Sequence, residues 1–236
     1  MHAASVVIKY GGHAMTQPDL QAAFAADLAQ LAAQGMDFAL VHGGGPQISA
    51  LLDRLHIASR FVDGLRVTDA ATLEVVEMVL CGQVNKAVVS ELAGHGVRAV
   101  GISGRDGGLL RARVQRPELG MVGTVEGVDP ALVRCLLAAG FVPVVAPLAN
   151  SPEGQALNIN ADTAAGALAG ALKAEYFVLV SDVPGVLDAQ GRLIPSLNRQ
   201  EIAALQREGV ISGGMIPKVL ACLDALDAGC QRALIL

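Results

Sequence analysis

The chain has 236 residues, of which 53% are hydrophobic, enough for one large α/β domain or two modest lobes. Its formal net charge of −5, without any run of basic residues, argues against a surface that binds nucleic-acid phosphates. The four cysteines lie far apart with no C-x-x-C pair, which is typical of reduced, buried thiols. The sequence shows no signal peptide and no apolar run of membrane-spanning length, so we expect a cytoplasmic protein without a membrane partner.

Strands and helices are predicted to alternate along the chain. Short apolar runs predict strands at 5–8, 38–41, 97–102, 142–146, 176–180 and 232–236. Capping signals and helical spacing predict helices that begin at a capping box (Thr16–Asp19), at Pro46 and after Asp129-Pro130, and others over 68–93, 160–172, 199–208 and 214–228. Between 109 and 128 the helical pattern is lost, and turn residues predict β-hairpins.

Buried strands that alternate with helices predict an α/β fold, a three-layer α/β/α sandwich with a mostly parallel central sheet. Ligands of such sheets bind beyond the carboxyl ends of the strands. The glycines of this sequence are concentrated at those strand ends, so we expect the functional site there.

The first two predicted strands each end in a glycine-rich segment. Lys9–Gly12 places an ammonium beside backbone N–H groups that can approach an anion, although a surface lysine next to a tight turn has the same pattern. His42–Pro46 contains three consecutive glycines and leads into a helix, whose N-terminal N–H groups and dipole favour an anion. Neither segment matches the P-loop or the dinucleotide-binding fingerprint, and both motifs are absent from the rest of the chain.

Two later segments place polar residues at helix starts. Asn158 and Asn160 alternate just before a helix and could present their amides to a ligand. Asp162 falls in the first turn of that helix, where it either favours the helix dipole or fixes the positions of two lysines. Further along, Gly213 and Gly214 open a helix that carries Lys218 in its first turns.

Two lysines and two sets of glycine N–H groups can hold a phosphoryl group and neutralise the charge that spreads over it during transfer. The segments therefore indicate phosphoryl transfer without a Walker motif. The histidines have no metal-ligand spacing, so no metal site built from protein side chains is predicted.

Taken together, these segments resemble the amino acid kinase family. The similarity runs from Val6 to the end of the chain, and its strongest blocks are Lys9–Gly12, His42–Pro46, Gly64–Thr68, Gly82–Lys86, Asn158–Thr163, Ser181–Leu187 and Gly213–Lys218. Within the family, they are most similar to members that phosphorylate the γ-carboxylate of N-acetyl-L-glutamate in arginine biosynthesis. The resemblance implies a phosphotransferase with a carboxyl group as acceptor, which uses ATP and Mg²⁺ and forms an acyl phosphate.

The resemblance also implies a role for each site residue. Lys9 and Lys218 would stabilise the transferring phosphoryl group, and Asp162 would orient both lysines. The residues implied for binding the acyl-amino acid are Gly44, Gly45, Arg66 and Asn158, with Arg66 pairing bidentately with its α-carboxylate. Those implied for binding phosphate and nucleotide are Gly11, Gly12, Ser181, Asp182, Val183, Gly185, Val186, Gly213, Gly214 and Met215.

The resemblance further implies two lobes: an N-lobe over about 1–173 for the acyl-amino acid and for dimerisation, and a C-lobe over about 174–236 for the nucleotide. The first strand begins near residue 5, without the extra helix that arginine-inhibited hexameric members carry. We therefore expect an arginine-insensitive homodimer with the 72–93 helix as its interface. The family usually continues beyond this C-terminus, so we expect the nucleotide lobe, or the sequence, to be incomplete there.

Two other functions share most of these features. A kinase for acetylated or carrier-linked α-aminoadipate differs in the length of its acceptor, and the Gly64–Thr68 block favours N-acetylglutamate. A non-catalytic effector-binding module of the same fold is disfavoured because Lys9, Asp162 and Lys218 are all retained.

Overall fold

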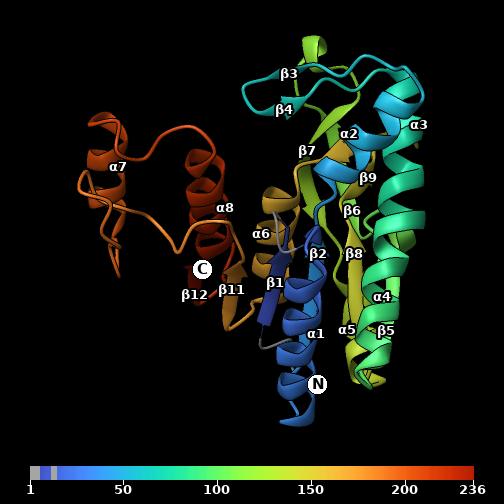
Figure 1. The fold of residues 1–236 in the computed structure, drawn as a ribbon, viewed down its shortest axis with the longest axis horizontal. Helices are drawn as coiled ribbons and strands as arrows, with labels where there is room; N and C mark the ends of the chain where they lie inside the picture. Colours follow the sequence, from blue (N-terminus) through green and yellow to red (C-terminus); the bar gives the residue numbers. More distant parts are fainter. Residues whose placement is uncertain (1–5, 12–14) are drawn as a thin grey trace.

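The computed structural model describes residues 6–11 and 15–236 and shows one central sheet with helices on both faces (Figure 1). The six strands lie in the order β12-β11-β1-β2-β8-β5, and all neighbouring pairs are parallel. Their bounds are β1 Val6–Tyr10, β2 Phe38–His42, β5 Ala99–Ser103, β8 Val142–Ala146, β11 Tyr176–Leu179 and β12 Arg232–Ile235. The predicted α/β/α sandwich is confirmed, and each predicted strand is found close to its expected position.

The strands are apolar on both faces, because alternate side chains point to opposite sides of the sheet. In β1, Val6 and Ile8 pack among residues of α1 and α4, whereas Val7 packs among residues of α5, α6 and α8. Such strands are buried only when a layer of helices covers each face. The helices are α1 Pro18–Ala33, α2 Gly45–Arg54, α3 Ala70–Glu77, α4 Asn85–Gly94, α5 Ala131–Ala138, α6 Ala161–Leu172, α7 Arg199–Arg207 and α8 Met215–Asp227.

Short strands outside the central sheet form two smaller units. A closed four-stranded barrel contains β6 Leu110–Val114, β7 Val122–Val128, β9 Leu148–Asn150 and β10 Ala156–Ile159. The antiparallel β6–β7 pair is the hairpin predicted between residues 109 and 128. A two-stranded ribbon of β3 (Phe61–Val62) and β4 (Leu65–Arg66) was not predicted, nor were β9 and β10, because such short strands carry too little periodicity.

One predicted helix feature is wrong, and another is confirmed with a change of helix type inside it. The capping box at Thr16–Asp19 does not form: α1 has Gln17 as its N-cap, without a side-chain capping bond, and Pro18 in its first turn. The fixed φ angle of proline suits this position, so the helix starts without a side-chain cap. The single helix predicted over 68–93 is divided into α3 and α4 by a π-helical segment, η2 (Met78–Val84). A π-helical turn shifts the residues that follow it, here beginning with Asn85, relative to a regular helix.

Helices α6 and α8 pack closely because α6 is built mostly from alanine and glycine. A Cβ atom added to Gly166 would lie only 2.6 Å from the backbone oxygen of Ala221 in α8. This contact brings the N-terminal turns of the two helices together, and with them Asp162 and Lys218.

The two-lobe division near residue 173 stays a prediction. Strands β11 and β12 continue the central sheet past that point, while Val186, Ile202, Ile211 and Val219 form a small separate core. Within the described residues, we find no helix that combines the length and the apolar character needed to cross a bilayer.

Candidate active site

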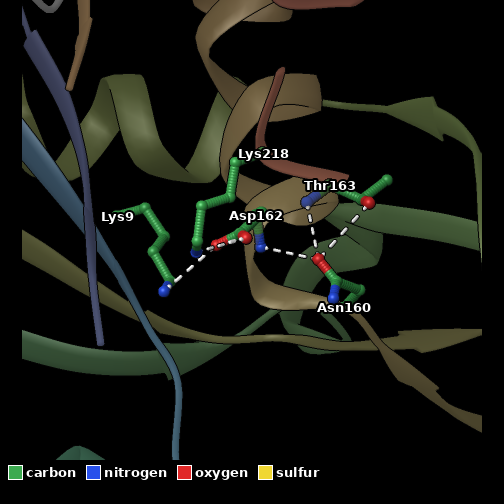
Figure 2. Close-up of polar contacts among 5 residues, drawn as sticks. All are labelled: Lys9, Asn160, Asp162, Thr163 and Lys218. Atoms are coloured by element: carbon green, nitrogen blue, oxygen red, sulfur yellow. Dashed lines mark hydrogen bonds and ion pairs between the residues drawn. The ribbon is translucent and has the colours of Figure 1, made fainter. Parts of the chain in front are cut away.

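One buried carboxylate joins three elements of the fold. Asp162 lies in the first turn of α6, Lys9 in β1 and Lys218 in the first turn of α8. The Nζ atom of Lys9 is 3.1 Å from Asp162 Oδ1, and Lys218 Nζ donates a hydrogen bond to Oδ2 at 3.0 Å. Figure 2 shows both ammonium groups directed at the same carboxylate.

This cluster is buried and carries a surplus positive charge. Lys9 is 7% exposed and Asp162 is 6% exposed, so the three charges interact in a medium of lower dielectric than water. Two lysines and one aspartate leave one positive charge without a compensating negative charge inside the cluster. Lys9 approaches Asp162 at ion-pair distance, while Oδ1 accepts no hydrogen bond within the described part of the chain. The Lys9 ammonium can therefore direct its N–H groups towards a bound anion.

The glycine-rich strand ends lie around this cluster where side chains do not fit. A Cβ atom on Gly11 would collide with the ammonium of Lys9, and one on Gly44 would lie 2.6 Å from Leu80 Cδ2. Gly44 is the N-cap of α2 and Gly45 its first residue, so their N–H groups have no carbonyl within the helix to bond. A helix start of this kind favours an anion. Gly12, also predicted to bind phosphate, lies outside the described residues.

The four residues predicted to bind the acyl-amino acid line one cleft of about 170 Å³. Gly44, Gly45, Arg66 and Asn158 share its wall with Asn160 and Ala161, which directly precede Asp162. Apolar side chains complete the lining: Ile48, Phe61, Leu65, Leu80, Val122, Pro147 and Ile159. The cleft thus combines a guanidinium and backbone N–H groups with apolar surface, beside the lysine–aspartate cluster.

Arg66 is almost entirely buried, and its guanidinium already has protein partners. Nη2 donates to the carbonyl oxygen of Gly45 at 3.1 Å and to Ser49 Oγ at 2.9 Å, while Nη1 donates to Ser59 Oγ. The guanidinium also lies over the ring of Phe61, 4.7 Å from its centroid. Burial lowers the pKa of Arg66, and the carboxylate of Asp53 opposes this effect. These bonds engage three of the five guanidinium N–H groups, which leaves two for a substrate carboxylate.

Asn158 is connected to Arg66 through Thr68, a residue for which no site role was predicted. Asn158 Nδ2 donates to Thr68 Oγ1 at 3.2 Å, and Thr68 Oγ1 donates to the carbonyl oxygen of Arg66 at 2.8 Å. Asp69, not Thr68, caps α3 by accepting the N–H of Thr72 at 2.8 Å. Thr68 is fully buried, so its hydroxyl serves this network.

Asn160 lines the cleft and also has a structural role that was not predicted. Its Oδ1 accepts the N–H groups of Asp162 at 2.9 Å and Thr163 at 3.1 Å and so caps α6 (Figure 2). The side-chain oxygen is thereby engaged in holding the backbone that carries Asp162. The signal was present in the sequence, because asparagine just before a helix is a favoured N-cap.

The residues predicted for the nucleotide lie in the C-terminal part of the chain. Ser181, Asp182 and Val183 follow β11, and Gly213, Gly214 and Met215 form the start of α8, near Lys218. Val186 and Met215 pack in the small separate core, so contacts from them to a nucleotide would come from the backbone. Within residues 6–11 and 15–236, no group of three acidic, histidine or cysteine side chains is arranged to hold a metal ion.

Comparisons with known proteins identify the family of the chain and related proteins. A family model described as the amino acid kinase family matches residues 4–236. A protein named acetylglutamate kinase from Sphingopyxis alaskensis is 53% identical to this chain, over 98% of this chain and 80% of the relative. A protein of the same name from Acidiphilium cryptum is 51% identical, over 98% of this chain and 82% of the relative.

Solved structures show the same fold. The structure of smu.665 from Streptococcus mutans UA159 aligns with a TM-score of 0.88 and 30% identity, over 98% of this chain and 93% of that one. N-acetylglutamate synthase from Neisseria gonorrhoeae, complexed with coenzyme A and N-acetyl-glutamate, aligns with a TM-score of 0.85 and 25% identity, over 100% of this chain and 55% of that one.

Proposed function

The chain belongs to the amino acid kinase family, and from this premise we propose that it transfers a phosphoryl group from ATP to the γ-carboxylate of N-acetyl-L-glutamate. The observation that carries the proposal is the pair of lysines held by Asp162 beside a cleft lined by Arg66 and glycine N–H groups. The acceptor follows from the relatives, which are about half identical over nearly the whole chain and are named for it.

The proposed reaction forms one P–O bond and breaks another. An oxygen of the γ-carboxylate attacks the γ-phosphorus of ATP, the bond to the bridging oxygen breaks, and ADP leaves with that electron pair. Lys9 and Lys218 neutralise the charge that develops on the transferring group, which is the main catalytic demand of phosphoryl transfer. Asp162 keeps the two ammonium groups on either side of its carboxylate, and the N–H groups of Gly11 and Gly44 add hydrogen bonds to phosphoryl oxygens.

The substrate and nucleotide are proposed to occupy different parts of the chain. Gly45, Arg66 and Asn158 would hold the acyl-amino acid in the cleft, while the segments at 181–186 and 213–215 would hold ATP. ATP would enter with Mg²⁺ on its phosphates, which supplies further charge neutralisation during transfer. The protein side would then consist of Lys9, Lys218 and backbone N–H groups.

The test is an ATP-dependent hydroxylamine trap for the acyl phosphate, run in parallel with acetylglutamate, acetylaminoadipate, glutamate and aspartate. We expect hydroxamate formation with acetylglutamate to exceed that with the other three acceptors. Faster turnover of acetylaminoadipate would reassign the acceptor, and no turnover with any of the four would reject the kinase function in favour of a ligand-binding role.

Homodimerisation through the 72–93 segment stays a prediction. Met78, in η2 of that segment, is 52% exposed in the single chain. Light scattering of the purified protein, with Met78→Glu as the variant, would measure the oligomeric state and show whether this surface forms the contact.

A further inference from the structure

A buried polar pair lies beneath the His42–Pro46 loop, among residues given no role above. His42, the last residue of β2, is 0% exposed, and Asn85, the first residue of α4, is 1% exposed. Buried polar side chains are costly unless they are hydrogen-bonded. Both of these side chains are hydrogen-bonded, and their bonds join the sheet to the glycine loop.

Asn85 links three neighbouring strands, β2, β8 and β5. Its Nδ2 lies 2.9 Å from the carbonyl oxygen of Val144 in β8, 3.2 Å from that of Ile102 in β5 and 3.1 Å from His42 Nε2. Its Oδ1 accepts a hydrogen bond from Lys86 Nζ at 3.0 Å, which fixes the orientation of the amide. Nδ2 is therefore a donor, and its two hydrogens are shared among the three acceptors.

The hydrogen bonds of Asn85 determine the tautomer of His42. Because Asn85 Nδ2 donates, His42 Nε2 has to accept, and the ring proton is assigned to Nδ1. Nδ1–H then donates to the carbonyl oxygen of Gly43 at 2.8 Å. The pKa of His42 is lowered to about 4: burial lowers it most, the hydrogen bond to Gly43 opposes this effect, and the charge of Lys86 also lowers it. The ring is neutral near pH 7, as this arrangement requires.

Both polar groups of Gly43 are hydrogen-bonded, and the pair holds one of them, the carbonyl oxygen. The N–H of Gly43 donates to the carbonyl oxygen of Tyr10 in β1 at 2.8 Å, and its carbonyl oxygen accepts from His42. A side chain on the next residue, Gly44, would collide with Leu80, which lies in η2. Hydrogen bonds thus hold the backbone of Gly43, and Leu80 restricts the backbone of Gly44. The N–H groups of Gly44 and Gly45 therefore point in a fixed direction at the start of α2.

Gly101 in β5 makes room for Asn85. A Cβ atom at this position would overlap Asn85 Oδ1 and lie 2.6 Å from Lys86 Nζ. Gly101 does not line the substrate cleft. Substitution at Gly101 can therefore displace the Asn85 amide without touching a bound ligand.

We propose that His42 and Asn85 are a positioning pair, which aims the backbone N–H groups of Gly44 and Gly45 at the acceptor and the transferring phosphoryl group. Neither side chain lines the cleft, so the pair acts through the glycine backbone. This inference deepens the proposed function and rests on it for the identity of the acceptor.

Steady-state kinetics of hydroxamate formation with acetylglutamate test the pair through three variants. His42→Phe keeps a ring but loses both nitrogens, and Gly101→Ala displaces Asn85. Each variant should lower kcat on the order of 10²-fold, because a misplaced reacting group has an effect of this size. The KM for ATP should not change in either variant. His42→Asn retains a donor near the position of Nδ1 and should recover most of the lost kcat. Wild-type kcat in His42→Phe or Gly101→Ala, or no recovery in His42→Asn, would overturn the proposal.

The matched control is Gly94→Ala at the end of α4, where an added Cβ meets no atom within 4 Å. It should leave kcat and both KM values unchanged.

A measurement on the wild-type protein keeps the inference testable if the variants fail to fold. ¹⁵N NMR of histidine-labelled protein should show His42 as the neutral Nδ1–H tautomer at pH 6; an Nε2–H tautomer or an imidazolium would overturn the pair. Failure of the proposed function gives a different pattern: wild-type protein without turnover on acetylglutamate, but with the expected His42 spectrum.

Discussion

The proposed acceptor side and the proposed nucleotide side of this molecule are built differently. On the acceptor side, hydrogen bonds link polar side chains that are buried, apart from the half-buried Asn158. Arg66, Thr68 and Asn158 form one network, and His42 and Asn85 form another. On the nucleotide side, the chain over 187–201 is largely exposed, and its ion pairs lie at the surface. That side is stabilised by a core of its own around Val186, Ile202, Ile211 and Val219.

This difference indicates that the two sides have different roles in binding. A largely buried, hydrogen-bonded network keeps its geometry before substrate arrives, which suits selection of an acceptor by shape and charge. An exposed segment with few buried contacts can change conformation at low free-energy cost, which suits closure over a nucleotide. Asp162 joins the two sides, because one of its lysines comes from β1 and the other from α8.

The largest expected effect follows from removing one of the two ammonium groups that contact Asp162. Lys218→Met keeps the length of the side chain but removes the ammonium, so kcat should fall by about 10²–10³-fold, as when one transition-state donor is lost. Steady-state kinetics with acetylglutamate and ATP measure the change. Lys173→Met, at the exposed C-cap of α6, is the control and should retain wild-type kcat. A Lys218→Met enzyme as fast as wild type would remove Lys218 from the proposed mechanism.

Arg66→Ala tests the acceptor side alone. Loss of charge-assisted hydrogen bonds worth about 1.5–3 kcal/mol should raise the KM for acetylglutamate by roughly 10- to 100-fold, with the KM for ATP unchanged. Initial-rate measurements that vary each substrate separate the two constants. If both KM values rose together, the acceptor and nucleotide sides would not be independent.

The pH dependence of stability tests whether the acceptor side is buried in solution as it is in the structure. The pKa of His42 is lowered from 6.5 to about 4, so between these values the unfolded chain binds a proton that the folded chain does not. His42 therefore favours folding fully above pH 6.5, and this contribution is lost as the pH falls towards 4. At pH 5 the loss should be about 2 kcal/mol relative to pH 7.

Urea unfolding at pH 7 and pH 5 measures this loss, and His42→Asn should remove it. An equal pH dependence in wild type and variant would mean that His42 is accessible to protons in the folded state.

The smallest effect is expected on the nucleotide side. Arg199 Nη1 lies 3.1 Å from Asp227 Oδ2, and both side chains are more than half exposed. Arg199→Ala should change the free energy of unfolding by less than about 1 kcal/mol and leave the kinetics unchanged, because solvent screens exposed pairs. Urea unfolding at pH 7 measures it; a larger loss would show that this side is more rigid than its exposure indicates.

Much of the fold could be predicted from local patterns. The six central strands are apolar on both faces, and Gly35 and Gly140 mark helix ends by adopting positive φ angles. Missed elements were those with weak local signals: β3 and β4 have two residues each, and η2 is a change of helix type inside a continuous apolar pattern. Pro18 also outweighed the apparent capping box before α1.

The sequence by itself determined the parallel α/β architecture and the chemistry of its strand ends, because hydrophobic period, glycine placement and lysine position are local properties of a chain. Only the tertiary structure decided which residues meet. Asp162 contacts Lys218 across 56 positions, Asn158 contacts Thr68 across 90, and Asn85 contacts His42 across 43. Such contacts depend on helix packing and strand order, and a buried polar group reveals its role only when its partners are known.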